Sequence, residues 1–276
     1  MVYNPDYPLI VGGQQRIVLN IVKLGVAVLA FDPPGQGERT QYWDAKQNRS
    51  AIGGCGWDME TCTASGVAHQ DEEYAGRQLL LTNVSAASVW LWDARRALGY
   101  LLSRREVDGA RVGVVGCSGG GTQAAFLSAT DRRLGPAAIG CYMSTLSQDL
   151  RLIGPTGKTE LSTPPHTHTV RRASGGSVAK LDGSQSGGAY ANWREAFHLG
   201  IDKPDLLEVR APKPTLIMST TDDPAFPVSG SRAAEREARQ VSEPHECARA
   251  CRVLWVSSRL LAGLRGVRER RKLGTD

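Results

Sequence analysis

Apolar positions follow helical spacing in some segments of the chain and form short continuous runs in others. The helical segments are residues 14–24, 85–102, 122–129, 192–199 and 231–240. The apolar runs predict strands at residues 8–11, 26–31, 111–116, 136–143 and 214–220, and the segment 254–261 fits a strand or a helix. Because strands and helices alternate, we expect an α/β fold with a mostly parallel sheet flanked by helices.

Two segments interrupt this alternation. Residues 155–189 are rich in Gly, Ser, Thr and Pro without clear periodicity, and they predict an inserted lid spanning 146–199. A long loop is expected between residues 40 and 82. The expected core therefore comprises residues 1–145 and 200–246, and it is followed by a divergent basic tail, 247–276, whose composition is also typical of a shifted reading frame.

The segment RVGVVGCSGGGTQ, residues 111–123, places Ser118 between Gly116 and Gly120, directly after a Val-rich run. A serine that attacks a carbonyl carbon needs a sharp strand-to-helix turn that lifts its hydroxyl clear of the backbone, with small residues on both sides. The pattern G-x-S-x-G in this context predicts a nucleophile. The alternative interpretation is an ordinary turn in which Ser118 caps the following helix.

A serine nucleophile requires a general base and a carboxylate, which follow it in the order acid, then histidine, in folds of this type. Asp223 follows the predicted strand 214–220, and Asp222 is the alternative acid. Chain order selects His245 as the base, although only one predicted helix separates it from Asp223 and it also fits an exposed position at a helix end.

The other histidines fit the triad less well. His69 and His198 precede the predicted acid, and His166 and His168 form an H-x-H pair inside the insertion. Such a pair could join a metal site, but no nearby carboxylate or cysteine pattern supports one, so no metal and no cofactor are expected.

Backbone N–H groups would stabilise the oxyanion of an attacked ester. Gly119 supplies one at the start of the helix after Ser118. Gly12 and Gly13, which lie between a predicted strand and a predicted helix, occupy the place of the loop that supplies the second. If Gly12 and Gly13 supply this second donor, the two strands that usually come first in the sheet are absent, and the sheet is shortened at the N-terminus.

The chain resembles α/β-hydrolases of the acetyl xylan esterase and dienelactone hydrolase-like group. The resemblance rests on residues 14–39, 92–123 and 200–223, with the helix and strand after Ser118, and covers roughly half of the chain. It implies Ser118 as nucleophile, Asp223 as triad acid, and metal-independent hydrolysis of carboxylic esters, often acetyl groups on carbohydrates. The chain departs from the group because no Gly-His segment follows Asp223.

Composition and charge limit the classes of partner and the cell compartment that we expect for this protein. Eight Arg or Lys residues against two acidic ones in the tail account for the net charge of +5, so the rest of the chain is near neutral and nucleic acid is not an expected partner. No apolar run reaches membrane-spanning length, and the N-terminus lacks a signal-peptide pattern. Six cysteines without C-x-x-C spacing fit a reduced compartment, so we expect a soluble cytoplasmic protein.

The sequence therefore predicts a serine-dependent carboxylic ester hydrolase acting on small-molecule or carbohydrate esters. One alternative is a catalytically impaired hydrolase-fold protein that binds ligands or partners, because the histidine motif is missing. Another is a serine peptidase of the same fold, which needs the same histidine to protonate its leaving amine.

Overall fold

The computed structural model describes residues 17–34, 39, 41–47, 49–51, 75, 76, 78, 79, 81, 82, 84–145, 147, 148, 199–221, 228–242 and 251–256. The chain forms two compact units, Met1–Asp108 with His168–Ala196, and Gly109–Thr167 with Phe197–Asp276. Most of the predicted insertion 146–199 and of the tail lies outside the described residues, so the predicted domain boundaries stay a prediction.

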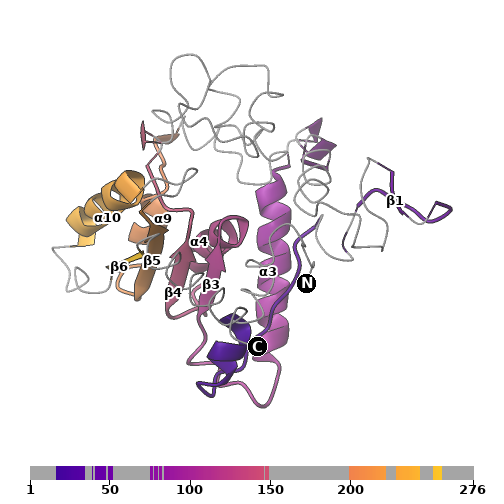
Figure 1. Cartoon of the computed structure of the whole chain (residues 1–276), viewed down its shortest axis with the longest axis horizontal. Coiled ribbons are helices and arrows are strands. Elements are labelled where there is room, and N and C mark those ends of the chain that lie inside the picture. Colours follow the sequence, from indigo (N-terminus) through magenta and orange to yellow (C-terminus); the bar gives the residue numbers. More distant parts are fainter. Residues whose placement is uncertain are drawn as a thin grey trace, which may run out of the picture. The chain divides into compact units, whose positions relative to one another are not determined.

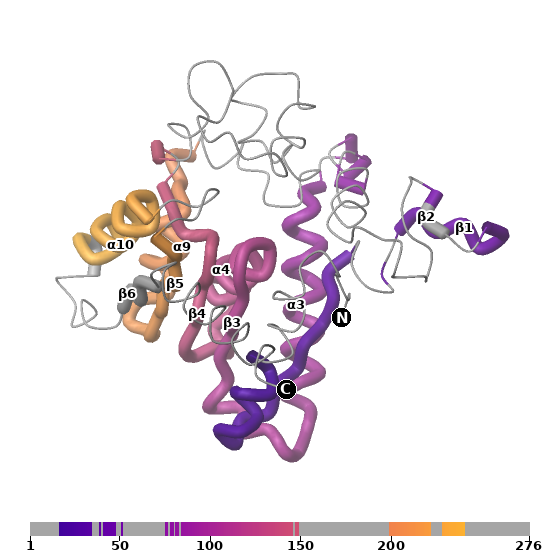
Figure 2. The backbone as a smooth tube through the Cα atoms, viewed as in Figure 1, coloured from indigo at the N-terminus to yellow at the C-terminus, as the bar shows by residue number. Residues whose placement is uncertain are grey.

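Helix α3, Ala86–Leu102, is the longest element among the described residues of the first unit (Figure 2). Ser85 begins it as predicted, because its Oγ accepts a hydrogen bond from the N–H of Ala87 at 3.2 Å. Its buried side chains recur every four residues, which is the amphipathic pattern that predicted it. They are Ala86, Trp90, Ala94 and Leu98.

The N-terminal part of this unit differs from the prediction. Residues 17–22 are helical, and Gly25 ends the helix with a φ of +79°, as its position suggested. The predicted strand at 26–31 is wrong, because these residues have neither helix nor strand pairing. An apolar run predicts burial, but a strand also needs a partner, which the run itself cannot specify.

In the loop predicted at 40–82, β1 (Trp43–Asp44) and β2 (Arg49–Ser50) form a small antiparallel ribbon.

The second unit contains a four-stranded parallel sheet in the order β3-β4-β5-β6. The elements that build this unit, drawn in Figure 1, are β3 (Val114–Cys117), α4 (Gly119–Thr130), β4 (Ala137–Gly140), α9 (Asp205–Glu208), β5 (Thr215–Thr220), α10 (Val228–Ser242) and β6 (Cys251–Val256). Helix α4 contacts β3 and β4, and α10 contacts β5 and β6. The predicted α/β class with a mostly parallel sheet flanked by helices is confirmed for the described residues.

Side-chain alternation explains how β5 packs. Thr215, Ile217 and Ser219 are buried, while the residues between them are half-buried. Ile217 joins the apolar core with Ile139 of β4 and Ala234 of α10. This period of two fixes which β5 side chains point into the unit. Ser219 is therefore a buried hydroxyl next to the carboxyl end of the strand.

A buried arginine joins the amino ends of the strands. Arg210 is 3% exposed, and its Nε donates to Thr215 Oγ1 at 2.7 Å. Its Nη1 donates to the carbonyl of Ser128 at 3.1 Å, and its Nη2 donates to the carbonyls of Gly135 and Pro214 at 3.0 Å. One guanidinium thus ties the end of α4 to the segments that enter β4 and β5.

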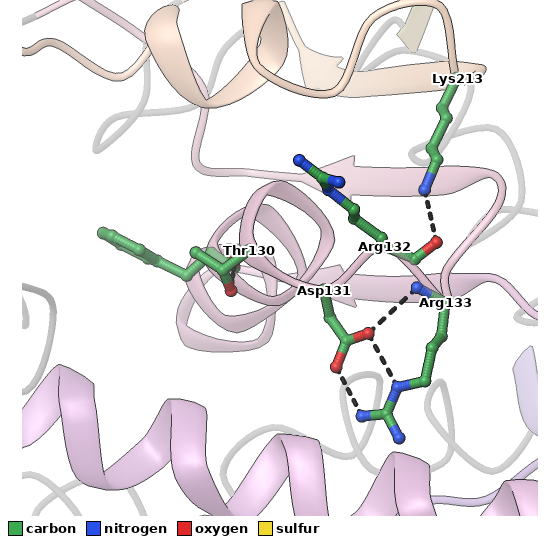
Figure 3. A network of polar contacts seen from close by, with 6 residues as sticks. Thr130, Asp131, Arg132, Arg133 and Lys213 are labelled. Atoms are coloured by element: carbon green, nitrogen blue, oxygen red, sulfur yellow. Dashed lines mark hydrogen bonds and ion pairs between the residues drawn. The ribbon is translucent and has the colours of Figure 1, made fainter.

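Lys213 strengthens the same edge. Its Nζ donates to the carbonyls of Arg132 at 2.7 Å and Leu134 at 2.8 Å. Beside it, Asp131 accepts from Nε and Nη2 of Arg133 at 2.9 and 2.6 Å, as Figure 3 shows. We refer to Arg210 and Lys213 together as the amino-edge clamp. It holds the α4–β4 connection against the start of β5.

Acidic side chains gather where α9 and α10 meet. Burial raises the pKa of Glu208, and the negative charges of Asp205 and Glu237 raise it further. Burial likewise raises the pKa of Glu237, as do the charges of Asp202 and Asp205, whereas Arg236 lowers it. Folding therefore makes both glutamates harder to deprotonate than they are in the unfolded chain.

Replacing Arg210 with Ala should lower the free energy of unfolding by about 3 kcal/mol or more, because two buried and two part-buried acceptors lose a charged donor. Denaturant unfolding measures this loss. Arg105→Ala is the matched control, since Arg105 is exposed, and it should change stability by less than about 0.5 kcal/mol. Equal effects of the two substitutions would contradict the assigned role of Arg210.

Glu237→Gln should raise Tm at about pH 7 and leave it nearly unchanged at about pH 4. A carboxyl whose pKa is raised by folding contributes its full stability below its unfolded pKa. That contribution is lost as the pH rises through the folded pKa, and the uncharged amide does not lose it. Glu106→Gln is the control, because Glu106 is exposed and lies 3.5 Å from Arg104. No gain in Tm at neutral pH for Glu237→Gln would contradict a Glu237 pKa that is raised by burial and by the neighbouring carboxylates.

Candidate active site

Ser118 occupies a strained turn between β3 and α4. Its φ is +57° and its ψ is −121°, a conformation that costs a residue with a side chain about 1–3 kcal/mol. Backbone hydrogen bonds hold it there. The N–H of Ser118 donates to the carbonyl of Gly140 at 3.0 Å, and the N–H of Thr122 donates to the carbonyl of Ser118 at 2.9 Å.

The Ser118 side chain does not cap the helix. Ser118 is the residue before α4, yet its Oγ makes no capping hydrogen bond to the first turn, and the residue is exposed. The alternative interpretation, an ordinary capping serine, is therefore wrong. A capping serine also adopts β-region backbone angles, as Ser85 does with a φ of −81°, and Ser118 does not.

Glycines allow the strand and the helix to approach each other in the Ser118 turn, which we define as residues 116–121. A Cβ on Gly116 would overlap the carbonyl of Gly120, so the two backbones touch at this point. Gly121 was not singled out from the sequence, although the run of three glycines was a signal. A Cβ on Gly121 would overlap the carbonyl of Gly140, because the first turn of α4 lies directly on the end of β4.

The first turn of α4 also supplies N–H donors. Gly119 is the first residue of the helix, and N–H groups in a first turn have no acceptor within the helix. They carry the positive end of the helix dipole. Such donors beside an exposed serine hydroxyl are the arrangement that stabilises the oxyanion of an attacked carbonyl.

A second strained residue follows β4, the neighbouring strand. Cys141 has a φ of +51°, and its N–H donates to the carbonyl of Met218 in β5 at 3.0 Å. Sequence reasoning gave no signal for it, because cysteine has no preference for this conformation. The carboxyl ends of β3, β4 and β5 are thus linked by successive backbone hydrogen bonds at the edge of the sheet where Ser118 lies.

The remaining predicted site residues lie outside the described residues. These are Asp223 and its alternative Asp222, His245, Gly12 and Gly13. The structure describes the residues on either side of the two aspartates, since β5 ends at Thr220 and α10 begins at Val228. Their predicted roles as acid, base and oxyanion donors stay predictions.

Two further properties concern the described residues alone. No group of three or more His, Cys, Asp and Glu side chains within them is arranged to hold a metal ion. None of the helices in these ranges has the length and apolarity that crossing a bilayer requires.

A parallel sheet with an exposed serine in a strained strand-to-helix turn is the arrangement of the α/β-hydrolase fold. No protein-family model matches the sequence, and no curated protein matches it. The support for the predicted α/β-hydrolase fold comes from the described strands, helices and turn.

Many solved structures are similar to the chain, among them the following three. A glucuronoyl esterase from Solibacter usitatus has a TM-score of 0.43 and 19% identity, and the match covers 63% of this chain and 44% of that one. A carbohydrate esterase family 15 glucuronoyl esterase from Caldicellulosiruptor kristjansonii has a TM-score of 0.48 and 17% identity, with coverages of 71% and 49%. The 2,6-dihydroxy-pseudo-oxynicotine hydrolase has a TM-score of 0.36 and 16% identity, with coverages of 63% and 41%. The chain spans less than half the length of each.

Gly116→Ala should disrupt the Ser118 turn, whereas Gly120→Ala should be tolerated. The new methyl group at 116 would overlap the Gly120 carbonyl, while a Cβ at 120 meets nothing within 4 Å. We expect Gly116→Ala to lower the free energy of unfolding by about 2 kcal/mol or more. Thermal unfolding of the two variants provides the comparison, and a Gly120→Ala loss as large as that of Gly116→Ala would count against the close approach.

Proposed function

We propose that this protein is a serine-dependent carboxylic ester hydrolase in which Ser118 is the nucleophile. The observation that carries the proposal is the backbone of Ser118, which is strained, exposed and not used to cap α4. Strain of this kind persists only where neighbouring structure enforces it, and it gathers at functional sites. Asp223, or Asp222 in its place, is the proposed acid, and His245 is the proposed base.

In this mechanism, Ser118 Oγ attacks the ester carbonyl carbon while the imidazole takes the hydroxyl proton. The N–H of Gly119, with that of Gly12 or Gly13, stabilises the tetrahedral oxyanion. The C–O bond to the alcohol then breaks, and the imidazolium protonates the departing oxygen. Water, deprotonated by the same imidazole, hydrolyses the acyl-enzyme and regenerates Ser118.

The proposed substrates are small-molecule or carbohydrate esters. Acetyl esters come first, because the sequence resembles acetyl xylan esterases. The similar solved structures include glucuronoyl esterases, so methyl and benzyl esters of glucuronic acid are useful additional substrates. A panel containing both classes distinguishes a small acyl group from a sugar acyl group at the attacked carbonyl.

One observation favours a second candidate, a catalytically impaired hydrolase-fold protein that binds ligands or partners. His245 lies in the connection from Ser242, the end of α10, to Cys251, the start of β6. Cys251 pairs with Thr215, the first residue of β5, so this connection enters the sheet at its amino edge. Ser118 follows the carboxyl end of β3, and a six-residue strand is about 20 Å long.

A base at position 245 would therefore have to span the distance from the amino edge to the carboxyl edge of the sheet to contact Ser118. All five histidines of the chain precede β6, whereas the usual triad histidine follows a strand after the acid. Without an effective base, ester hydrolysis would fall by several orders of magnitude, and only the turnover supported by the oxyanion donors would remain.

Turnover of 4-nitrophenyl acetate by the full chain, Ser118→Ala and His245→Ala tests both candidates. For an ester hydrolase we expect Ser118→Ala to lower kcat/KM by about 10³-fold or more, because the acyl-enzyme cannot form. His245→Ala should lower it similarly if His245 is the base.

Equal rates for the unchanged chain and Ser118→Ala would refute the hydrolase and support the impaired protein. A loss confined to Ser118→Ala would show that His245 is not the base. Arg105→Ala serves as the control, since Arg105 is exposed and lies outside the Ser118 turn.

A further inference from the structure

Three buried polar groups form a short chain of hydrogen bonds near the carboxyl ends of β4 and β5. Ser231 of α10 is 2% exposed and Ser219 of β5 is 3% exposed. The Oγ of Ser231 lies 2.7 Å from the carbonyl oxygen of Met143 and 3.2 Å from the Oγ of Ser219. The Ser231 hydroxyl is the donor in both contacts, so its one proton is shared between the Met143 carbonyl, which is the nearer acceptor, and Ser219 Oγ.

This hydroxyl chain, Ser219–Ser231–Met143, joins three separate parts of the fold. Ser219 is the residue before the end of β5, Ser231 lies in the first turn of α10, and Met143 is the third residue after β4. Residues this far apart in sequence meet only when the helix start, the strand end and the loop after β4 are all in register. The hydroxyl chain therefore fixes that register.

Close packing supports the same contact. A Cβ on Gly230 would overlap Ser144 Oγ, so the first turn of α10 lies directly on the fully buried Ser144. One residue earlier, Ser229 Oγ is 3.4 Å from Gln148 Oε1. The start of α10 is thus held against the segment 143–148 by hydrogen bonds and by backbone proximity.

The contact also connects to the Ser118 turn. The Ser118 N–H bonds to the last residue of β4, and the N–H of Cys141 bonds to β5. Met143 is two residues after Cys141. Hydrogen bonds, joined by short stretches of backbone, therefore link the proposed nucleophile through the end of β4 to Ser219 and Ser231.

Only seven residues separate the end of β5 at Thr220 from the start of α10 at Val228, and two of these are Asp222 and Asp223. Both ends of this connection are fixed by the hydroxyl chain. The inference made from this rests on the proposed function, in which one of these aspartates is the acid.

We infer that Ser231 is a positioning residue for the reaction. It fixes the end of β5 and the start of α10, which lie on either side of the acid-bearing connection, against the loop after β4. The last residue of β4, Gly140, accepts the hydrogen bond from the Ser118 N–H. It does not touch the reacting atoms. A misplacement of about 1 Å among groups that react in concert can cost about 100-fold in rate, so a buried hydroxyl remote from the substrate can control kcat.

The test compares Ser231→Ala with Ser128→Ala in the full chain. Ser128 is a matched control, because it is also a buried serine, 3% exposed, and its Oγ donates to the carbonyl of Ala125 within α4. Each substitution removes one buried hydroxyl and should cost about 1–3 kcal/mol of stability. With 4-nitrophenyl acetate, we expect Ser231→Ala to lower kcat by about 10- to 100-fold with KM within about twofold of the unchanged chain.

Ser128→Ala should leave both kinetic parameters unchanged at a comparable loss of Tm. Ser219→Ala removes only the more distant of the two acceptors of Ser231 and keeps the bond to Met143, so its kcat should fall by less than that of Ser231→Ala. It also provides the kinetic test if Ser231→Ala does not fold.

Failure of this inference and failure of the proposed function give different results. If Ser118→Ala abolishes turnover while Ser231→Ala and Ser219→Ala match Ser128→Ala in kcat, the positioning role is overturned and the hydrolase stands. If Ser118→Ala is as active as the unchanged chain, the proposed function is overturned, and the positioning role with it.

Discussion

The close approach of β3 to the first turn of α4 is the constraint on which the candidate site depends. Gly116 and Gly120 touch through their backbones, and Gly121 lies equally close to the end of β4. This contact leaves no room for a relaxed turn, so the residue between strand and helix takes a positive φ. Because that residue is Ser118, the strain places a hydroxyl at the carboxyl edge of the sheet, beside first-turn N–H donors.

The two edges of the parallel sheet are built differently. At the amino edge, Arg210 and Lys213 bind carbonyl groups of the connections that enter β4 and β5. At the carboxyl edge, Ser118 and Cys141 adopt strained conformations, and buried hydroxyls fix the start of α10. The stability of one edge thus offsets the strain held at the other. An α/β sheet binds its ligands at the carboxyl edge, which agrees with the position of Ser118.

Local sequence patterns predict the helices, turns and strands whose conformation depends mainly on residues close together in the chain. The helical spacing predicted α3 from its buried stripe, and the G-x-S-x-G segment predicted the turn at Ser118 because glycine and serine have specific backbone requirements there. The strand expected at 136–143 is shorter, Ala137–Gly140, since Cys141 turns away with a positive φ. The segment 254–261, which fitted a strand or a helix, contributes to β6 at Cys251–Val256.

Contacts between distant segments could not be predicted in this way. The bonds of Arg210 to the end of α4, and of Ser231 to Met143, join residues more than 80 positions apart, and no spacing rule selects them. For the same reason, the sequence alone does not predict which residues meet to form the triad. Ser118 follows from its own turn, whereas the pairing of Asp223 and His245 depends on where separate connections meet.

The central claim is that the Ser118 turn makes one hydroxyl nucleophilic. Its most direct measurement is peptide mapping by mass spectrometry after treatment of the full chain with a fluorophosphonate, which bonds covalently to activated serine oxygens. The account predicts one adduct, on Ser118, formed by the unchanged chain and by Arg105→Ala but lost in Ser118→Ala. An unmodified Ser118, or adducts spread equally over other serines, would contradict it.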